Sequence, residues 1–280
     1  METSNKSIIV FSLLILLALN LVTWFFILSE NNLTEIDFLD VGQGDATLIN
    51  FHNSGKIMID AGPNRSVLDE LGGNLSFFEK KIDVLILSHA NLDHYGGFFE
   101  IIEKYKPRVF VFNGVNSTSE TFQNLLTLVK NNGMAMISVR AGDKIKIGND
   151  VAEIISPLGG VDFSEKNLNN SSLVLRVIIN GYRALFLGDA DGSFLKKIED
   201  NLATDILKVS HHGSKNGTDE ALLDLINPKI ALIGVGQDNK YGHPADVVID
   251  LLEGLGVKIF RTDKNGNISI KFGEELIIRD

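Results

Sequence analysis

Two histidines and an aspartate are concentrated in one short stretch, Ser88-His89-Ala90-Asn91-Leu92-Asp93-His94-Tyr95-Gly96-Gly97. The apolar run at residues 82–87 before it is typical of a buried strand, and residues 96–102 begin a helix. The imidazoles and the carboxylate therefore lie at a strand end, where loops carry chemistry on a rigid scaffold. Such ligands suit a divalent metal such as zinc or manganese. The alternative is an ordinary strand-to-helix turn in which Asp93 caps the helix.

Four further polar turns carry the same types of residue: Asp40, Gln43 and Asp45; Asp189; His211 and His212; and His243. Five of the six histidines fall in such glycine-flanked turns, whereas a random scatter would place some on helix faces. This clustering favours one metal site built from several strand ends. Taken singly, Asp189 also suits a turn, Asp40 and Asp45 also suit a hairpin, and Asp60 at a strand end is compatible with either role.

The composition limits the class of protein and the kind of site. Of the 280 residues, 44% are hydrophobic and 22% are charged, which is typical of a globular protein. The net charge of −10 argues against binding nucleic acid over the whole surface, although a bound metal would supply its own positive charge. The chain has no cysteine, so any metal must be held by histidine, carboxylate or amide oxygen.

The N-terminal segment has the pattern of a membrane anchor. Residues 8–28 are almost wholly apolar, with aromatic residues near the far end, and the run is long enough to cross a bilayer as a helix. Lys6 before it and Glu30 after it favour an orientation with the N-terminus inside the membrane-bounded compartment and the main domain outside. A cleaved signal peptide is the alternative, but its apolar core is shorter, roughly 7–15 residues. We expect an anchor at residues 1–30 and a single extracytoplasmic hydrolase domain at residues 31–280.

Beyond the anchor, apolar runs alternate with turns and helices. Hairpin-connected strands are expected first, then strand–helix units, with helices near residues 97–105, 118–130, 219–226 and 244–254. Residues 159–172 are expected to form a loop beside the site. Asp263-Lys264-Asn265-Gly266 is a hairpin signal between two late strands. This order predicts two mixed sheets covered by helices.

Seven blocks of sequence resemble, in order, the metallo-β-lactamase superfamily, and within it the soluble hydrolase domain of the ComEC DNA-uptake proteins and their stand-alone relatives. The blocks are residues 38–45, 59–62, 88–97, 169–175, 187–189, 208–214 and 241–244. They cover about residues 35–275. The resemblance implies an αββα sandwich of the α+β class with one or two divalent metal ions at one edge.

The resemblance also implies roles for individual residues. His89 would bind a first metal, whereas Asp93, His94 and His211 would bind a second, and Asp189 would bridge the two. Asn91 stands where the family has histidine or aspartate, and Asn170 and Ser171 stand near the place of another family histidine. The first metal position is therefore expected to be weak or absent. The surrounding shell is expected to contain Asp40, Gln43, Asp45, Asp60 and Asn91.

For catalysis, a metal-bound water supplies hydroxide at neutral pH. Asp93 is expected to orient this water or act as base, and His212 and His243 are candidates for contact with phosphate or for protonation of the leaving group. The substrate-binding candidates are Asn170, Ser171, Ser214, Lys215 and His243. The resemblance points to phosphodiester hydrolysis of DNA, with any membrane channel supplied by a separate protein.

Two other functions stay open from the sequence. The domain could hydrolyse a small ester, a thioester or a cyclic nucleotide, which a narrow buried pocket would favour over an open groove. It could also be a degenerate domain that binds nucleic acid or a partner protein without turnover.

Overall fold

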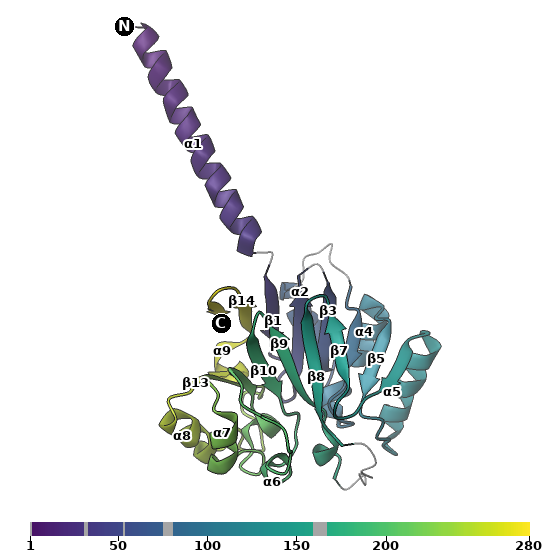
Figure 1. Ribbon diagram of the computed structural model, residues 1–280. Coiled ribbons are helices and arrows are strands. Elements are labelled where there is room, and N and C mark those ends of the chain that lie inside the picture. The colour runs from purple at the N-terminus through teal and green to yellow at the C-terminus, as the bar shows by residue number, and fades with distance from the viewer. Residues whose placement is uncertain (1, 31–32, 53, 75–80, 159–166) are drawn as a thin grey trace. The chain divides into compact units, whose positions relative to one another are not determined.

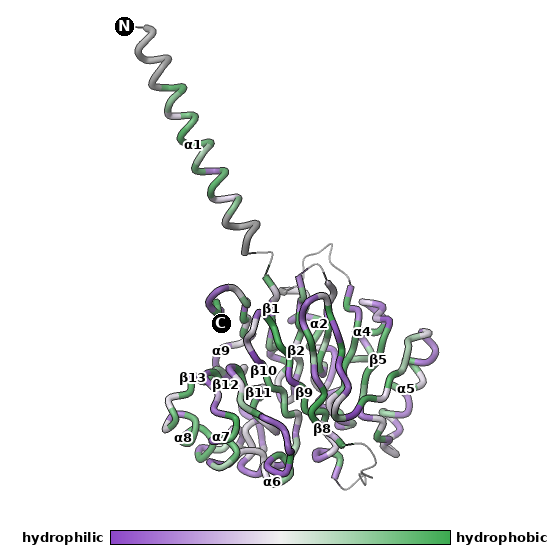
Figure 2. Tube along the Cα trace, viewed as in Figure 1, coloured by the Kyte–Doolittle hydropathy of each residue, from purple (hydrophilic) through white to green (hydrophobic). Residues whose placement is uncertain are grey.

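The computed structural model describes residues 2–30, 33–52, 54–74, 81–158 and 167–280, in two compact units, Met1–Leu33 and Thr34–Asp280. The first unit contains helix α1 (Glu2–Glu30), whose described side chains are exposed and mostly apolar (Figure 2). Among the described residues, no helix is both long and apolar enough to span a membrane. The anchor at residues 1–30 thus stays a prediction. Residues 159–166 of the expected loop, and the side chains of Lys6 and Glu30, lie outside the described part.

Two sheets face each other in the second unit, with helices on their outer sides (Figure 1). The first sheet has the order β15-β14-β1-β2-β3-β4-β5-β6 and the second has the order β13-β12-β11-β10-β9-β8-β7. In the first sheet, the pairs from β15 to β3 are antiparallel and those from β3 to β6 are parallel. In the second, β7 to β10 pair antiparallel and β10 to β13 pair parallel.

The strands of the first sheet are β1 (Thr34–Phe38), β2 (Ala46–Phe51), β3 (Gly55–Ala61), β4 (Val84–Ile86), β5 (Val109–Phe112), β6 (Ala135–Ser138), β14 (Ile268–Phe272) and β15 (Leu276–Arg279). Those of the second are β7 (Lys144–Ile147), β8 (Asp150–Ser156), β9 (Val174–Ile179), β10 (Tyr182–Phe186), β11 (Ile206–Lys208), β12 (Ile230–Ile233) and β13 (Lys258–Arg261).

The helices fall into two groups, one for each sheet. Helices that pack on the first sheet are α2 (Val67–Asn74), α3 (Leu92–Tyr95), α4 (Phe98–Tyr105) and α5 (Glu120–Asn131). Those that pack on the second are α6 (Gly192–Leu195), α7 (Glu220–Ile226) and α8 (Asp246–Gly254). Short α9 (Thr262–Asn265) links β13 to β14, and two 3-10 turns, η2 (Asn169–Ser171) and η3 (Ser210–Gly213), precede β9 and follow β11.

An apolar core between the sheets holds the layers together. Phe38 of β1 stacks on Phe186 of β10 with ring centroids 5.9 Å apart, and both rings are buried. Burying one such ring stabilises the fold by about 1.5–3 kcal/mol, more than the roughly 0–1 kcal/mol of an exposed ion pair. Further clusters lie under each helical layer. The expected αββα sandwich is confirmed.

Two local features differ from expectation. The hairpin predicted at residues 263–266 is wrong, because β13 pairs in the second sheet and β14 in the first. The turn residues instead lie in α9, where the chain crosses between layers. Helix α2 was not predicted, since Gly72 and Gly73 are poor helix formers, yet Val67 and Leu71 are fully buried in the layer beneath it.

Candidate metal centre

Loops at one edge of the sandwich bring the chemically active side chains together. His89, Asp93 and His94 follow β4, with the latter two on α3. Asp189 follows β10, and His211 and His212 lie in η3 after β11. β4 and β11 each lie in the parallel part of a sheet, so their carboxyl ends supply this edge. In α/β sheets, ligands are commonly bound just beyond such strand ends.

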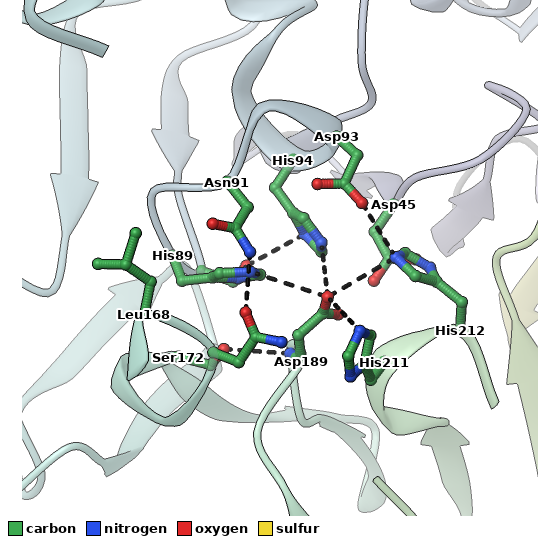
Figure 3. Close-up of polar contacts among 12 residues, drawn as sticks. Asp45, His89, Asn91, Asp93, His94, Leu168, Ser172, Asp189, His211 and His212 are labelled. Atoms are coloured by element: carbon green, nitrogen blue, oxygen red, sulfur yellow. Dashed lines mark hydrogen bonds and ion pairs between the residues drawn. The ribbon is translucent and has the colours of Figure 1, made fainter. Parts of the chain in front are cut away.

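Four histidines converge on one carboxylate oxygen (Figure 3). The Oδ2 atom of Asp189 lies 3.3 Å from Nε2 of His94, 3.7 Å from Nε2 of His212, and 3.8 Å from Nε2 of both His89 and His211. Asp189 and three of the histidines are buried, whereas the side chain of His211 is 28% exposed. The sequence prediction that these strand ends meet is thus reproduced in space.

The tightest group differs from the predicted ligand set in one member. One ligand atom from each of Asp93, His94, Asp189 and His212 lies within 4.8 Å of the others. The Oδ2 atom of Asp93 is 3.4 Å from Nε2 of His212. The sequence predicts His211 as a metal ligand and His212 as a candidate for phosphate contact or leaving-group protonation, so His212 takes the predicted place of His211 in this group. Both residues adopt left-handed backbone conformations, with φ of 49° and 53°. The side chain of His212 is buried, whereas that of His211 lies nearer the surface.

The side-chain atoms that face the centre of this group make no hydrogen bond within the described part of the chain. Among the described residues, Nε2 of His89, His94 and His212 and Oδ1 of Asp189 are buried without a hydrogen bond. An unsatisfied buried polar group costs about 1–3 kcal/mol, so four at one point would be expensive. A divalent cation would satisfy them, and the imidazole and carboxylate donors suit zinc or manganese. The residues present therefore fit a divalent metal.

The opposite ring nitrogens are held by acceptors. Nδ1 of His94 lies 2.8 Å from Oδ2 of Asp60, and Nδ1 of His212 lies 2.8 Å from the carbonyl oxygen of Gly234. When each Nδ1–H donates to its acceptor, the lone pair on Nε2 faces Asp189. Such outer hydrogen bonds fix the tautomer and orientation of metal-binding histidines.

Ser88 was missed as a supporting residue by the sequence analysis. Its backbone N–H donates to Oδ1 of Asp60 at 2.8 Å, and its hydroxyl donates to Oδ2 at 2.7 Å. The same hydroxyl is 3.0 Å from Nδ1 of His89. Ser88 therefore joins the outer partners of two histidines, and Asp60 has the supporting position that the sequence analysis proposed.

Lys208 was also missed. This buried residue of β11 donates from Nζ to Oδ2 of Asp45 at 2.5 Å, and Oδ1 of Asp45 lies 3.3 Å from Nδ1 of His212. Asp45 is thus tied to the site rather than only to a turn. The available signal was a lysine in an otherwise apolar strand, since a buried charge requires a partner.

Without a metal, the surroundings shift the pKa values of the clustered side chains in different directions. Burial, with the neighbouring charge of His94, lowers the pKa of His89 to about 3. Burial opposes protonation of His212, but Asp189 and a second carboxylate raise its pKa to about 10. The pKa of His94 is raised well above its ordinary value in the same way, against the effect of burial. Burial would raise the pKa of Asp189, but the histidines hold it well below its usual range.

The predicted first metal position, beside His89, is surrounded by neutral side chains instead of further metal ligands. The amide of Asn91 donates to Oδ1 of Asn169 at 2.8 Å. Asn170 donates to Asp191 at 3.0 Å and accepts from its backbone N–H at 2.8 Å. Ser171 is buried, and its hydroxyl donates to a backbone carbonyl oxygen at 2.6 Å. These neutral side chains stabilise the loop that carries η2.

The remaining predicted residues lie around the group without joining it. Asp40 and Gln43 accept hydrogen bonds from backbone N–H groups, at 3.2 and 3.3 Å. Ser214 is buried and Lys215 is exposed on the turn after η3. His243 is half-buried on a later turn and is not a member of the close group.

Comparison with known proteins decides the family. A family model described as the metallo-beta-lactamase superfamily matches residues 39–237. The chain belongs to this superfamily. ComE operon protein 3 of Bacillus subtilis is 31% identical over 258 residues, covering 85% of this chain and 33% of that protein. Competence protein ComA of Neisseria gonorrhoeae is 27% identical over 247 residues, covering 84% of this chain and 32% of that protein.

These relatives confirm the resemblance to competence proteins, although the chain spans only about a third of their length. Among solved structures, the metallo-beta-lactamase fold protein YhfI of Bacillus subtilis matches with a TM-score of 0.57. It is 12% identical, and the match covers 86% of this chain and 100% of that chain. At this identity the match shows the fold alone. The chain is thus a metal-dependent hydrolase of the metallo-β-lactamase superfamily, related to competence proteins.

Proposed function

We propose that the chain hydrolyses phosphodiester bonds of DNA with one divalent ion, zinc or manganese, held by Asp93, His94, Asp189 and His212. The observation that carries the proposal is the convergence of buried, unsatisfied histidine nitrogens on Asp189. In this proposal residues 1–30 anchor the domain on the extracytoplasmic face of a membrane. Any channel for DNA is a separate membrane protein.

When bound, the ion lowers the pKa of a water molecule and offsets negative charge on the phosphoryl group. Asp93 is placed to orient that water, because its side chain is 35% exposed while Oδ2 faces His212. Burial would raise the pKa of Asp93, but the neighbouring His212 and His94 lower it, so the group is ionised at neutral pH and can accept a proton. His211, more exposed than its neighbour, faces the substrate side, where it and His243 contact phosphate or protonate the leaving group.

A single ion is favoured by the neutral side chains beside His89. An amide is a weaker ligand than the carboxylate or imidazole of the superfamily pattern, and the amide nitrogen of Asn91 already donates to Asn169. His89 contributes an additional imidazole next to Asp189. Its low pKa keeps it neutral, so it can act as a hydrogen-bond acceptor or a weak ligand.

DNA as the substrate rests on the relatives that are named as competence proteins. With a net charge of −10, the local cations at the site must provide the attraction for phosphate. Lys215, exposed on the turn that follows the histidine pair, is one such group. Ser214 and Asn170 are the proposed neutral donors around it. The predicted contact from Ser171 is not proposed, because this side chain is buried and its hydroxyl donates within its own loop.

The two alternative functions have less support. A cavity of about 530 Å³, the size of a small-molecule site, is lined by residues of β7, β8 and the segment around α6, and by no member of the metal group. This cavity is therefore not placed to hold a small ester or thioester against the metal group. A binding domain without turnover would leave the unsatisfied polar atoms around Asp189 unexplained.

The proposal is tested on the full chain in detergent, depleted of metal and reloaded with Zn²⁺ or Mn²⁺. Hydrolysis of bis(p-nitrophenyl) phosphate and of end-labelled single-stranded and duplex DNA is measured. We expect Asp93→Asn to lower the rate by about 10²–10⁴-fold, because a general base or water-positioning group is lost. Asp40→Asn, the same substitution outside the metal group, serves as the control. Absence of hydrolysis by the wild type, or full activity of Asp93→Asn, would overturn the proposal.

A further inference from the structure

An exposed aromatic ring lies at the outer end of a row of histidines. Tyr241 is 59% exposed, and its ring stacks on His243 with centroids 6.0 Å apart and an interplanar angle of 21°. The ring of His243 lies 5.7 Å from that of His211, whose Nε2 is 3.8 Å from Asp189. The rings therefore form a continuous path from the protein surface to the metal group.

One side chain fixes the loop that carries Tyr241. The amide nitrogen of Asn239 donates to the carbonyl oxygens of Gly236, at 3.1 Å, and His243, at 2.6 Å. Its amide oxygen accepts from the backbone N–H groups of Tyr241, at 3.2 Å, and His243, at 3.0 Å. Four hydrogen bonds to one amide hold both rings in place before any ligand arrives. Such preorganisation lowers the entropy cost of binding.

The chemistry of this surface suits a nucleobase. Every base has a π-face, so an exposed aromatic ring binds bases by stacking without reading their sequence. Lys240 is exposed next to Tyr241, with Nζ 5.4 Å from the ring centroid. Its long flexible side chain can move from the ring to the phosphate that adjoins a stacked base. A duplex keeps its bases stacked on one another, so only a single strand offers a free base face.

We infer that Tyr241 is a stacking platform for one base of single-stranded DNA, near the phosphodiester that lies at Asp189. Lys240 binds a neighbouring phosphate, and Asn239 is a positioning residue for the platform. This inference rests on the proposed function and narrows its substrate to single strands. None of these three residues belongs to the metal group.

Binding is measured by fluorescence anisotropy on the full chain in detergent, with EDTA present so that no strand is cleaved. The two probes are a labelled oligothymidylate and an oligonucleotide of the same length in which the bases are replaced by abasic sites. We expect Tyr241→Ala to weaken binding of the oligothymidylate by about 5- to 150-fold, which corresponds to loss of one stacked base. Tyr241→Phe should retain binding, and the abasic probe should bind wild type and Tyr241→Ala alike.

Leu225→Ala is the matched control, since it removes another exposed large side chain, 53% exposed, from the surface of α7. Equal binding of both probes by the wild type, no detectable binding, or unchanged oligothymidylate binding by Tyr241→Ala would overturn the inference. Failure of the proposed function is recognised separately, because the wild type would then not hydrolyse bis(p-nitrophenyl) phosphate with metal present.

Discussion

The substitution Asp60→Asn tests whether the carboxylate behind His94 makes that histidine a metal ligand. Oδ1 of Asp60 accepts the backbone N–H of Ser88, so the amide oxygen of asparagine is expected to take that position. The amide NH₂ would then replace Oδ2, which now lies 2.8 Å from Nδ1 of His94 and accepts from the Ser88 hydroxyl. The Ser88 hydroxyl and the Nδ1–H of His94, both hydrogen-bond donors, would then face the NH₂ group, which is also a donor. His94 would lose its acceptor and with it the tautomer that leaves Nε2 free.

The expected loss follows from one hydrogen bond to a charged group, which contributes about 1.5–3 kcal/mol. Each 1.4 kcal/mol is a factor of ten in affinity, so the Kd for metal should rise by about 10- to 100-fold. The same range is typical when an outer partner of a metal-binding histidine is removed.

Metal affinity of the full chain is measured by competition with a chromophoric chelator. Asp40→Asn is the matched control, because Asp40 accepts from the N–H of Gly42 and lies outside the metal group. A Kd within about threefold of the wild type, or an equal loss in Asp40→Asn, would refute the reasoning.

Protons, a second ion and the buried ion pair provide three further tests. Against the effect of burial, carboxylates raise the pKa of His212 to about 10 and that of His94 well above its ordinary value. Both histidines therefore carry protons at pH 7 without metal. Calorimetry of metal binding in buffers of different ionisation enthalpy should show about two protons released per ion, and the affinity for metal should increase from pH 6 to pH 8. Release of no protons would count against this ligand set. Asn91→Asp should add a second bound ion per chain in equilibrium dialysis, and an unchanged stoichiometry would argue against the role given to Asn91. Lys208→Met should lower the free energy of unfolding in urea by about 3–5 kcal/mol, because Asp45 loses the cation 2.5 Å away. The double variant Lys208→Met/Asp45→Asn should recover most of the lost stability. An equally large loss of stability in the double variant would show that the unpaired Asp45 is not the cause.

The layered fold was predictable because its local patterns agree with one another. Apolar runs such as residues 82–87 end at polar turns, and the strands and helices that they predict are largely those observed. The failures concern tertiary context. Gly72 and Gly73 disfavour a helix, but burial of Leu71 against the sheet outweighs that preference in α2. The turn at residues 263–266 resembles a hairpin, and no local signal shows that its two strands join different sheets.

The candidate site was predictable in membership more than in geometry. The sequence places histidines at strand ends, but two adjacent histidines carry no signal for which one points inward. Both positions have a left-handed backbone, and only the packed structure shows that His212 is buried and His211 is not. Lys208 was overlooked for a similar reason, because its partner Asp45 lies 163 positions earlier in the chain. Contacts over such separations exist only once the sheets have packed.

The metal content of the full chain tests the central claim most directly. After equilibration with Zn²⁺ or Mn²⁺ and removal of excess, the metal is quantified per chain in the wild type and in Asp189→Asn. Because the unsatisfied atoms of the site converge on Asp189, we predict one tightly bound ion in the wild type and none in folded Asp189→Asn. A wild-type chain that binds no ion, or an Asp189→Asn chain that retains it, would contradict the account.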